Sequence, residues 1–432
     1  MEQTFEFPKD FLWGAATSSH QVEGGNINND WWQWEQNGNF KERSGEACDH
    51  WNRFREDFAL AKSLHHNVHR FSLEWSRIEP QEGRFSEESL LHYREVIESL
   101  KSNGIEPVIT LYHFTLPLWL ARKGGWLFNE TPFLFARYVR KIVETVGEGI
   151  CYWITLNEPV AYVFKSHLMG EWPPFEKSYE KALQALSHLL KGHVLAYNAI
   201  KEVNQELNRP SAQVGIAKHV LIFTPCSERS WKDRLSVRIR NLMFNHIFIK
   251  ALIRGQIFYP GLFHIRLPKA RTLDFIGLNY YTRDFVHNEG FRIPKIFGDI
   301  CTLKHHREIG KRNFLSWEIY PQGLYQLVKE FSQYGLPLLV TENGVCIDHD
   351  EERYEFIISH LIQLAKAMKD GAKVFGYLYW SLLDNYEWGD GYAPRFGLIE
   401  VDYTTQSRKV RESARKFAEI CKSGQIYGEG SS

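Results

Sequence analysis

The hydrophobic pattern of the chain alternates between short apolar runs and longer helical segments. Eight runs are rich in β-branched and aromatic residues, and they cover residues 11–16, 68–75, 107–113, 151–156, 213–220, 274–281, 338–341 and 374–380. Because strands that are apolar on both faces and alternate with helices form parallel β-α units, the pattern predicts an α/β protein. Eight such units predict a closed (β/α)8 TIM barrel.

Helical periodicity is clear between the runs, above all in residues 86–103, 179–207 and 351–369. The first of these segments also carries terminal signals. Ser86 is at an N-cap position, acidic residues follow it in the first turn, and Asn103-Gly104 marks the C-terminal end.

The alternative architecture is an open doubly wound sheet with a second domain. No glycine-rich phosphate loop follows any of the apolar runs, and the composition does not change along the chain. One barrel can accommodate a chain of this length, because such barrels extend beyond ~400 residues. We therefore expect residues 1–432 to form one domain, in which 423–432 is a frayed polar tail.

Composition and charge narrow the possible partners. The chain has 52 Lys+Arg and 52 Asp+Glu, so its formal charge is zero and it shows no basic stripe for a nucleic acid. The longest apolar run, residues 374–383, is far shorter than the ~20 residues that span a membrane. Because indole rings stack on the C–H faces of sugars, the 14 Trp residues weakly favour a carbohydrate site, although most of them belong to the core.

Cysteines and histidines indicate the compartment and the need for metals. The six cysteines lack CxxC spacing, so we interpret them as free thiols; they are Cys48, Cys151, Cys226, Cys301, Cys346 and Cys421. The first ten residues do not resemble a signal peptide, and we expect a reducing, cytoplasmic compartment. His65, His66 and His69, like His305 and His306, lack a fourth ligand in the sequence, so we interpret them as surface residues and expect no metal or other cofactor.

Two short motifs carry candidate chemistry, and they cover residues 155–159 (TLNEP) and 340–344 (VTENG). Each follows an apolar run, so Glu158 and Glu342 lie where a buried strand ends. The carboxyl ends of all barrel strands meet on one face, which brings the two carboxylates together. One such glutamate could equally well form a structural ion pair. Two of them are what glycoside hydrolysis requires.

Further polar or aromatic residues follow other runs, at positions where core packing does not explain them. They are Gln21, Glu74, Arg77, His113, Asn157, Asn279, Tyr281 and Trp380. Their placement predicts one polar site at the carboxyl ends of the strands.

With these residues placed, the chain resembles glycoside hydrolase family 1, the retaining β-glycosidases, and especially its compact bacterial and archaeal members. Segments that carry the resemblance follow one another in order at residues 11–24, 70–72, 111–114, 155–159, 278–282, 341–344 and 380–388. The resemblance implies hydrolysis of the terminal non-reducing β-glycosidic bond of small β-glycosides or oligosaccharides by double displacement. It implies chiefly β-glucosidase activity, with β-fucosides and β-galactosides also accepted.

The resemblance also implies the catalytic roles, with Glu158 as the acid/base and Glu342 as the nucleophile. A retaining site holds its carboxyl groups ~5–5.5 Å apart. Arg70 near Glu342 would keep that carboxylate ionised, and Tyr281 would donate a hydrogen bond to it. The charge on Glu342, together with burial, would then keep Glu158 protonated.

The same resemblance implies a set of substrate-binding residues, namely Gln21, His113, Asn157, Asn279, Tyr281, Trp317, Trp380, Glu387 and Trp388. Asn157 corresponds to the residue that holds the sugar 2-hydroxyl, and Trp317 to a platform for the leaving group. Other interpretations compete at some positions, since Trp380 and Trp388 could be core aromatics and His113 a structural histidine.

The chain departs from the family pattern at Phe114, where Trp is commoner, and this removes an indole N–H from the site. Glu387 is followed by Trp388 and then by Asp390, whereas 6-phospho-β-glycosidases carry a small residue followed by Lys and Tyr. We therefore expect an unphosphorylated sugar. A carbohydrate- or glycolipid-binding protein on the same fold and a transglycosylase are the alternatives; the presence of both glutamates favours the hydrolase.

Overall fold

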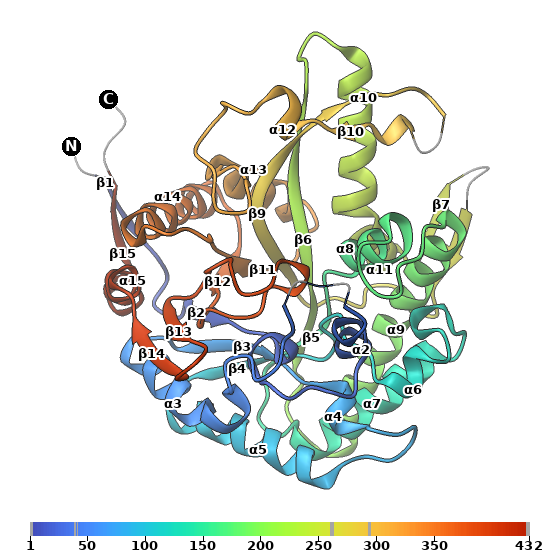
Figure 1. Ribbon diagram of the computed structural model, residues 1–432, viewed down its shortest axis with the longest axis vertical. Coiled ribbons are helices and arrows are strands. Elements are labelled where there is room, and N and C mark those ends of the chain that lie inside the picture. The colour runs from blue at the N-terminus through green and yellow to red at the C-terminus, as the bar shows by residue number, and fades with distance from the viewer. Residues whose placement is uncertain (1–2, 39, 41, 260–262, 293–294, 429–432) are drawn as a thin grey trace.

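The chain forms a closed barrel of eight parallel strands (Figure 1). The computed structural model describes residues 3–38, 40, 42–259, 263–292 and 295–428. Around the barrel the order is β9-β11-β12-β2-β3-β4-β5-β6, and β6 pairs back to β9. The strands are β2 (Leu12–Ala16), β3 (Val68–Ser72), β4 (Glu106–Thr110), β5 (Tyr152–Asn157), β6 (Gln213–Pro225), β9 (Ile276–His287), β11 (Leu338–Asn343) and β12 (Val374–Trp380). Each predicted run overlaps one strand, so the (β/α)8 barrel is confirmed and the open sheet is wrong.

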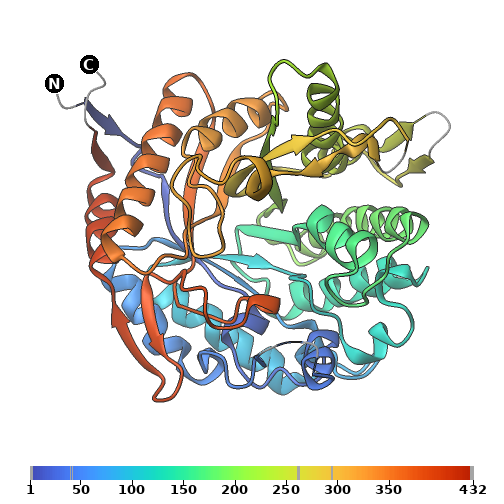
Figure 2. The same ribbon diagram turned by 45° about the horizontal axis from the view of Figure 1, so that its top comes forward.

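A helix follows each barrel strand and packs on the outside of the barrel (Figures 1 and 2). These helices are α3 (His50–Ser63), α5 (Glu87–Ser102), α7 (Thr131–Val146), α9 (Tyr179–Glu206), α11 (Ile247–Arg254), α13 (Gln322–Ser332), α14 (Asp350–Lys369) and α15 (Glu412–Ser423). The predicted cap of α5 is confirmed, because the Ser86 side chain accepts a hydrogen bond from the Ser89 amide at 3.1 Å. Within the described ranges, no helix is both long and apolar enough to cross a membrane.

Shorter elements connect these units. The helical ones are α1 (Ser19–Val22), α2 (Asp30–Gln36), α4 (Trp75–Ile78), α6 (Leu118–Ala121), η1 (Gly125–Leu127), α8 (Pro159–Val163), η2 (Phe164–Met169), α10 (Trp231–Arg240), η3 (Asn241–His246), η4 (Lys295–Phe297), α12 (Thr302–His305) and η5 (Trp388–Asp390). The extended ones are β1 (Gln3–Glu6), β7 (Gln256–Tyr259), β8 (Phe263–Arg266), β10 (Asp299–Ile300), β13 (Ile399–Asp402), β14 (Ser407–Val410) and β15 (Gln425–Gly428).

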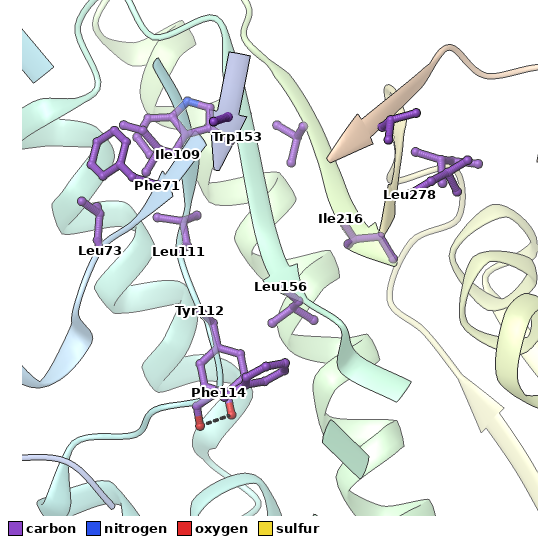
Figure 3. Packing of buried hydrophobic residues seen from close by; sticks show 14 of the residues in the cluster. Phe71, Leu73, Ile109, Leu111, Tyr112, Phe114, Trp153, Leu156, Ile216 and Leu278 are labelled. Carbon is purple, nitrogen blue, oxygen red and sulfur yellow. Dashed lines mark hydrogen bonds between the residues drawn. The ribbon is translucent and has the colours of Figure 1, made fainter. Parts of the chain in front are cut away.

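Side chains alternate between the inside and the outside of the barrel, as the pleat of a strand requires. Val68 of β3 belongs to a small buried cluster with residues from the other strands. Phe71 of β3 faces the helices outside the barrel. It is paired in register with Ile109 of β4, which is paired in turn with Trp153 of β5, and all three belong to the large apolar cluster (Figure 3). Apolar residues therefore fill both faces, which leaves the carboxyl ends of the strands for polar groups.

Two histidines predicted to be surface residues are buried, and that interpretation was wrong. His66 is 1% exposed and His69 is fully buried, whereas His65 is exposed as predicted. His69 lies on the outer face of β3, where its Nε2 is 3.1 Å from the Thr17 hydroxyl. Polarity alone suggested solvent, but the helices around the barrel cover this face.

The predicted frayed tail at 423–432 is wrong over its first part. Residues of β15 pair with β1 in an antiparallel ladder from Glu6↔Gln425 to Gln3↔Gly428, and Ile426 is buried. The partner strand lies at the other end of the chain, so no local pattern could indicate this pairing. Residues 429–432 lie outside the described part of the chain.

The strands β6 and β9 continue beyond the predicted runs, to Pro225 and His287. Their extended halves pair with each other and project from the barrel together with α10, β10 and α12 (Figures 1 and 2). We call this projection the β6–β9 arm.

Candidate active site

The residue Glu158 joins the end of β5 to the start of α8. Its backbone is left-handed, with φ 45° and ψ 50°, a conformation that costs a non-glycine residue about 1–2 kcal/mol. Its amide donates to the Ala217 carbonyl at 2.7 Å, and Pro159 begins the helix. The local turn is therefore held from both sides, and it directs the Glu158 side chain into a cavity.

The cavity has a volume of about 500 Å³ and opens at the carboxyl ends of the strands. Most of the predicted site residues line it, namely Gln21, His113, Asn157, Glu158, Tyr281, Trp317, Glu342, Trp380, Glu387 and Trp388. The other two, Arg70 and Asn279, are fully buried and bond to lining residues. The structure thus brings the whole predicted set to one place.

A continuous chain of hydrogen bonds connects the two glutamates. Arg70 donates from one guanidinium nitrogen to Glu342 Oε1 and from another to Asn157 Oδ1, both at 2.6 Å. Asn279 Nδ2 donates to Asn157 Oδ1 at 3.2 Å and to Glu158 Oε1 at 2.8 Å. Every member is at least nine-tenths buried, so the network holds both carboxylates in defined orientations.

The surroundings of the two carboxyl groups differ in charge. Burial raises the pKa of both. On Glu342 the Arg70 guanidinium opposes this rise, and the Tyr281 hydroxyl, which donates at 2.6 Å, also lowers the pKa. On Glu158 the opposing groups are the Asn279 amide and the more distant charges of Lys218 and Arg70. The negative charge of the pair is therefore better stabilised on Glu342, which alone accepts a hydrogen bond from a cation.

The neighbours of His113 determine which nitrogen of its imidazole ring carries the proton. Asn157 uses its carbonyl oxygen to accept from Arg70, so its Nδ2 faces His113 Nε2 at 3.1 Å and donates to it. Burial and then the charge of Arg70 hold the pKa of His113 well below its usual value, which keeps the ring neutral. The proton is consequently on Nδ1, which is buried and has no hydrogen-bond partner among the residues that the structure describes.

Another polar group lies where Gln21, Trp380 and Glu387 meet. Glu387 accepts from the Trp380 indole at 3.2 Å and from the Gln21 amide at 3.3 Å. Burial raises the pKa of Glu387 to about 8, and the charges of Glu342 and Asp390 add to this rise. At neutral pH the side chain is therefore mostly a neutral acid, which can both donate and accept.

Aromatic side chains form the walls. Trp317 is half-buried and lies 5.6 Å from the Tyr281 ring between centroids. Phe114 is buried against Trp172, at 4.9 Å, and against Trp388, at 5.4 Å. The site thus combines flat apolar surfaces with the polar groups described above, which is the composition that a sugar ring requires.

Two polar residues at the end of β3 do not line the cavity. Glu74 caps α4 and accepts from the Ser76 hydroxyl at 2.6 Å, and Arg77 donates to Glu23 at 3.0 Å. These side chains hold neighbouring loops in place. Sequence position alone did not distinguish them from residues of the site.

The structure adds two residues near Glu158 that the motifs did not indicate. His219 Nδ1 is 3.5 Å from Glu158 Oε2. Lys218 is fully buried, donates to the His219 carbonyl and lies over the Phe244 ring, and burial lowers its pKa to about 7. A lysine inside an apolar strand run was the signal that could have drawn attention to this position.

Replacing Arg70 by methionine is expected to lower the free energy of unfolding by about 3–5 kcal/mol, because it leaves the buried Glu342 carboxylate without its cation. Urea denaturation measures this effect. The matched control is Arg140→Met in the exposed Arg140–Glu206 pair, which should cost less than about 1 kcal/mol. Equal losses in the two variants would contradict the importance of the buried pair.

The sequence model of glycosyl hydrolase family 1 matches residues 3–426. The chain belongs to this family. Beta-glucosidase A of Thermotoga maritima is 33% identical to it, over 98% of this chain and 99% of that protein. A beta-galactosidase of Pyrococcus woesei is 32% identical, over 96% of each chain.

Solved structures of family 1 enzymes have the same fold. A beta-glycosidase from Pyrococcus horikoshii gives a TM-score of 0.90 at 41% identity, over 98% of this chain and 96% of that one. The beta-glucosidase from Thermotoga maritima in complex with glucoimidazole gives 0.88 at 32% identity, over 97% and 99%.

As a family 1 member, the chain is a glycosidase, and the predictions of family, fold and enzyme class are confirmed. The prediction of a retaining exo-β-glycosidase is confirmed as well, and no comparison supports the alternative of a non-catalytic binding protein. The roles of individual residues are not assigned by these similarities and stay predictions.

Proposed function

We propose that this family 1 glycosidase is chiefly a β-glucosidase, which also accepts β-fucosides and β-galactosides, with Glu158 as acid/base and Glu342 as nucleophile. The observation that carries the proposal is the buried hydrogen-bond chain from Glu342 through Arg70, Asn157 and Asn279 to Glu158. It supplies two carboxyl groups of unequal charge in one cavity, as double displacement requires. The relatives named beta-glucosidase and beta-galactosidase support the sugar class.

In the first step, Glu342 attacks the anomeric carbon while Glu158 gives its proton to the leaving oxygen. The glycosyl–Glu342 ester carries no negative charge, so Glu158 no longer has a carboxylate as its neighbour and its ionised form becomes more favourable. Glu158 then takes a proton from water, which attacks the ester and releases the sugar with its original configuration. No metal takes part in these steps.

The remaining predicted residues have proposed roles in holding the sugar. His113 Nδ1 donates to a hydroxyl, and the Asn157 amide holds the 2-hydroxyl. The neutral Glu387 acid, with Gln21, exchanges hydrogen bonds with the outer hydroxyls, while Trp380 and Trp388 pack on the ring. Trp317 forms the platform for the leaving group.

The test is hydrolysis of nitrophenyl β-glucoside, β-fucoside, β-galactoside and β-mannoside at neutral pH with EDTA present. Turnover led by the glucoside or the fucoside is the expected result. No turnover of any member by protein that still binds glucose would overturn the assignment. Activity that disappears with EDTA and returns with zinc would contradict the metal-free mechanism.

The enzyme is expected to hydrolyse 6-phospho-β-glucoside with a kcat/KM roughly 100-fold or more below that for the β-glucoside. Asp390 lines the cavity, and its carboxylate repels a phosphate dianion by several kcal/mol at ~4 Å, while the neutral Glu387 acid beside it offers the phosphate no positive charge. Lys165 also lines the cavity but is paired with Glu171. Steady-state kinetics on both substrates measure the ratio, and comparable values would overturn the expectation of an unphosphorylated sugar.

Replacing Lys218 by methionine is expected to move the basic limb of the kcat/KM profile to higher pH, by about half a unit to one unit. The charge of Lys218 lowers the pKa of Glu158, so its removal raises that pKa and keeps the acid protonated to higher pH. The exposed Lys232→Met change is the control and should leave the profile in place. A shift toward lower pH would show that Lys218 does not act on Glu158 in this way.

We also propose that the enzyme works in a reducing, cytoplasmic compartment. All six cysteines are free thiols in the structure, which supports this placement. Cell fractionation with antibodies to the chain tests it.

A further inference from the structure

The β6–β9 arm gathers sulfur and nitrogen ligands that the glycosidase reaction does not use. Cys226 follows β6, Cys301 is the N-cap of α12 and His305 is its last residue, so segments 75 residues apart meet here. One possible ligand atom from each of these residues lies within 4.8 Å of the other two. We call these three residues the Cys-Cys-His cluster. None of them lines the active-site cavity.

The arm holds the cluster in place through backbone hydrogen bonds. The Cys226 amide donates to the Val286 carbonyl and the Cys301 amide to the Phe285 carbonyl, both at 2.8 Å, so β9 positions both thiols. Within α12, the His305 amide donates to the Cys301 carbonyl at 3.0 Å. This spacing of four residues puts the Cys301 and His305 side chains on one side of the turn.

The distances fit a tetrahedral ion. Zinc lies about 2.3 Å from sulfur and about 2.0 Å from nitrogen, which places neighbouring sulfur and nitrogen ligands about 3.6 Å apart. Cys226 Sγ is 3.1 Å from His305 Nδ1 and 3.4 Å from His306 Nε2. The His306 ring stacks on Phe285, with 3.9 Å between centroids, and this contact holds it beside the thiol.

Other polar groups near Cys226 are engaged differently. Asp233 and His287 also come within 4.8 Å of it. The Asp233 carboxylate, however, already accepts from the backbone amides of Ser227, at 3.2 Å, and Asn288, at 3.0 Å. Thiols and imidazoles therefore remain as the available donors, and these are the ligands that zinc prefers over oxygen-binding cations such as magnesium.

We propose that Cys226, Cys301 and His305 bind one Zn²⁺ ion, with water in the fourth position, because His306 approaches Cys226 but does not join the other two ligands. The ion takes the place of the two thiol protons, which pass to solvent, and fastens α12 to the end of β6. Arg312 then transmits the constraint, because it donates to the carbonyls of His306, at 2.5 Å, and Ser316, at 3.0 Å. The site is thus a structural support for the segment that leads to Trp317, and hydrolysis itself proceeds without the metal.

The test is titration of the untagged, fully reduced and chelator-stripped protein with Co²⁺, which reports tetrahedral thiolate ligation by its visible absorption. We expect saturation at one equivalent and loss of the absorption when Zn²⁺ is added. Cys226→Ser and Cys301→Ser should abolish the absorption. Changing a residue that only supports a metal ligand typically lowers metal affinity ~10–100-fold. Because His305 is proposed as a ligand itself, His305→Ala should weaken Co²⁺ binding by a larger factor.

The chain supplies a control in Cys151, an exposed cysteine outside the cluster, and Cys151→Ser should bind Co²⁺ as the wild type does. Hydrolysis of a nitrophenyl glycoside by each variant shows that the barrel is folded. Zn²⁺ should also slow proteolysis between residues 301 and 317.

Absence of thiolate–cobalt absorption, or equal absorption in Cys301→Ser, would overturn the proposal. Mass spectrometry of the isolated protein gives a further check. A mass lower by two hydrogens, with Cys226 and Cys301 joined in one peptide pair, would show a disulfide in place of a metal site and would overturn the proposal.

Discussion

Replacing Glu342 by glycine is expected to lower kcat for an aryl β-glucoside by a factor on the order of 10⁵, because no carboxylate remains to form the glycosyl-enzyme. The sugar contacts proposed for Gln21, His113 and Glu387 remain, so glucose should still bind. Steady-state kinetics with calorimetric measurement of glucose binding separate the two effects.

Azide makes this prediction more specific. The small anion can occupy the space that Glu342 leaves and attack the anomeric carbon from the same side, so the product should be the α-glycosyl azide. Glu74→Gln is the matched control, because Glu74 is also a buried strand-end glutamate but caps α4 outside the cavity. Its turnover per folded molecule should stay close to that of the wild type. Undiminished hydrolysis by Glu342→Gly would remove Glu342 from the mechanism.

Replacing Glu158 by alanine is expected to have an effect that depends on the leaving group. For a poor leaving group such as an alkyl alcohol, loss of proton donation should lower kcat/KM by about 10²–10⁴-fold. A dinitrophenyl glycoside leaves without protonation, so its first step should change little while breakdown of the glycosyl-enzyme becomes slow. A burst of dinitrophenol in stopped-flow measurements would report the accumulated intermediate.

The pH profile and the azide product give independent checks on Glu158. Without the acid, the basic limb of kcat/KM for the dinitrophenyl glycoside should disappear, because burial raises the pKa of Glu158 and its deprotonation sets that limb in the wild type. Azide should now attack the glycosyl-enzyme from the side of the leaving group and give the β-glycosyl azide. An α-azide product from this variant would mean that the roles of Glu158 and Glu342 are reversed.

Much of the barrel could be predicted from local patterns. Strands buried on both faces need continuous apolar runs, and the outer helices need a face of period 3.6, so both types of element are visible in short windows of sequence. The cap at Ser86 is equally local, because it depends on a side chain and an amide three residues away. The motif residues Glu158 and Glu342 were found for the same reason, since Glu158 directly follows β5 and Glu342 is the last residue but one of β11.

Other features depend on partners that are distant in the sequence. Nothing near Gln425 indicates that it pairs with Glu6, and nothing near His69 indicates that a helix covers it. The burial of Lys218 beside Glu158 and the approach of Cys226 to α12 belong to the same class. The approach of Cys226 to α12 arises from the long pairing of β6 with β9, whereas β1 and β15 pair in a small sheet of their own.

The sequence by itself determined the eight β-α units, the family and the residues that could perform the chemistry, because these depend on residue type and on local spacing. Only the tertiary structure decided which of those polar residues share the hydrogen-bond network between the glutamates, and which, like Glu74, hold loops. It also decided the charge state of Glu387 and the neutral tautomer of His113. The physical reason is that pKa values and hydrogen-bond partners depend on burial and on distances across the barrel, and these distances exist only once the strands have closed.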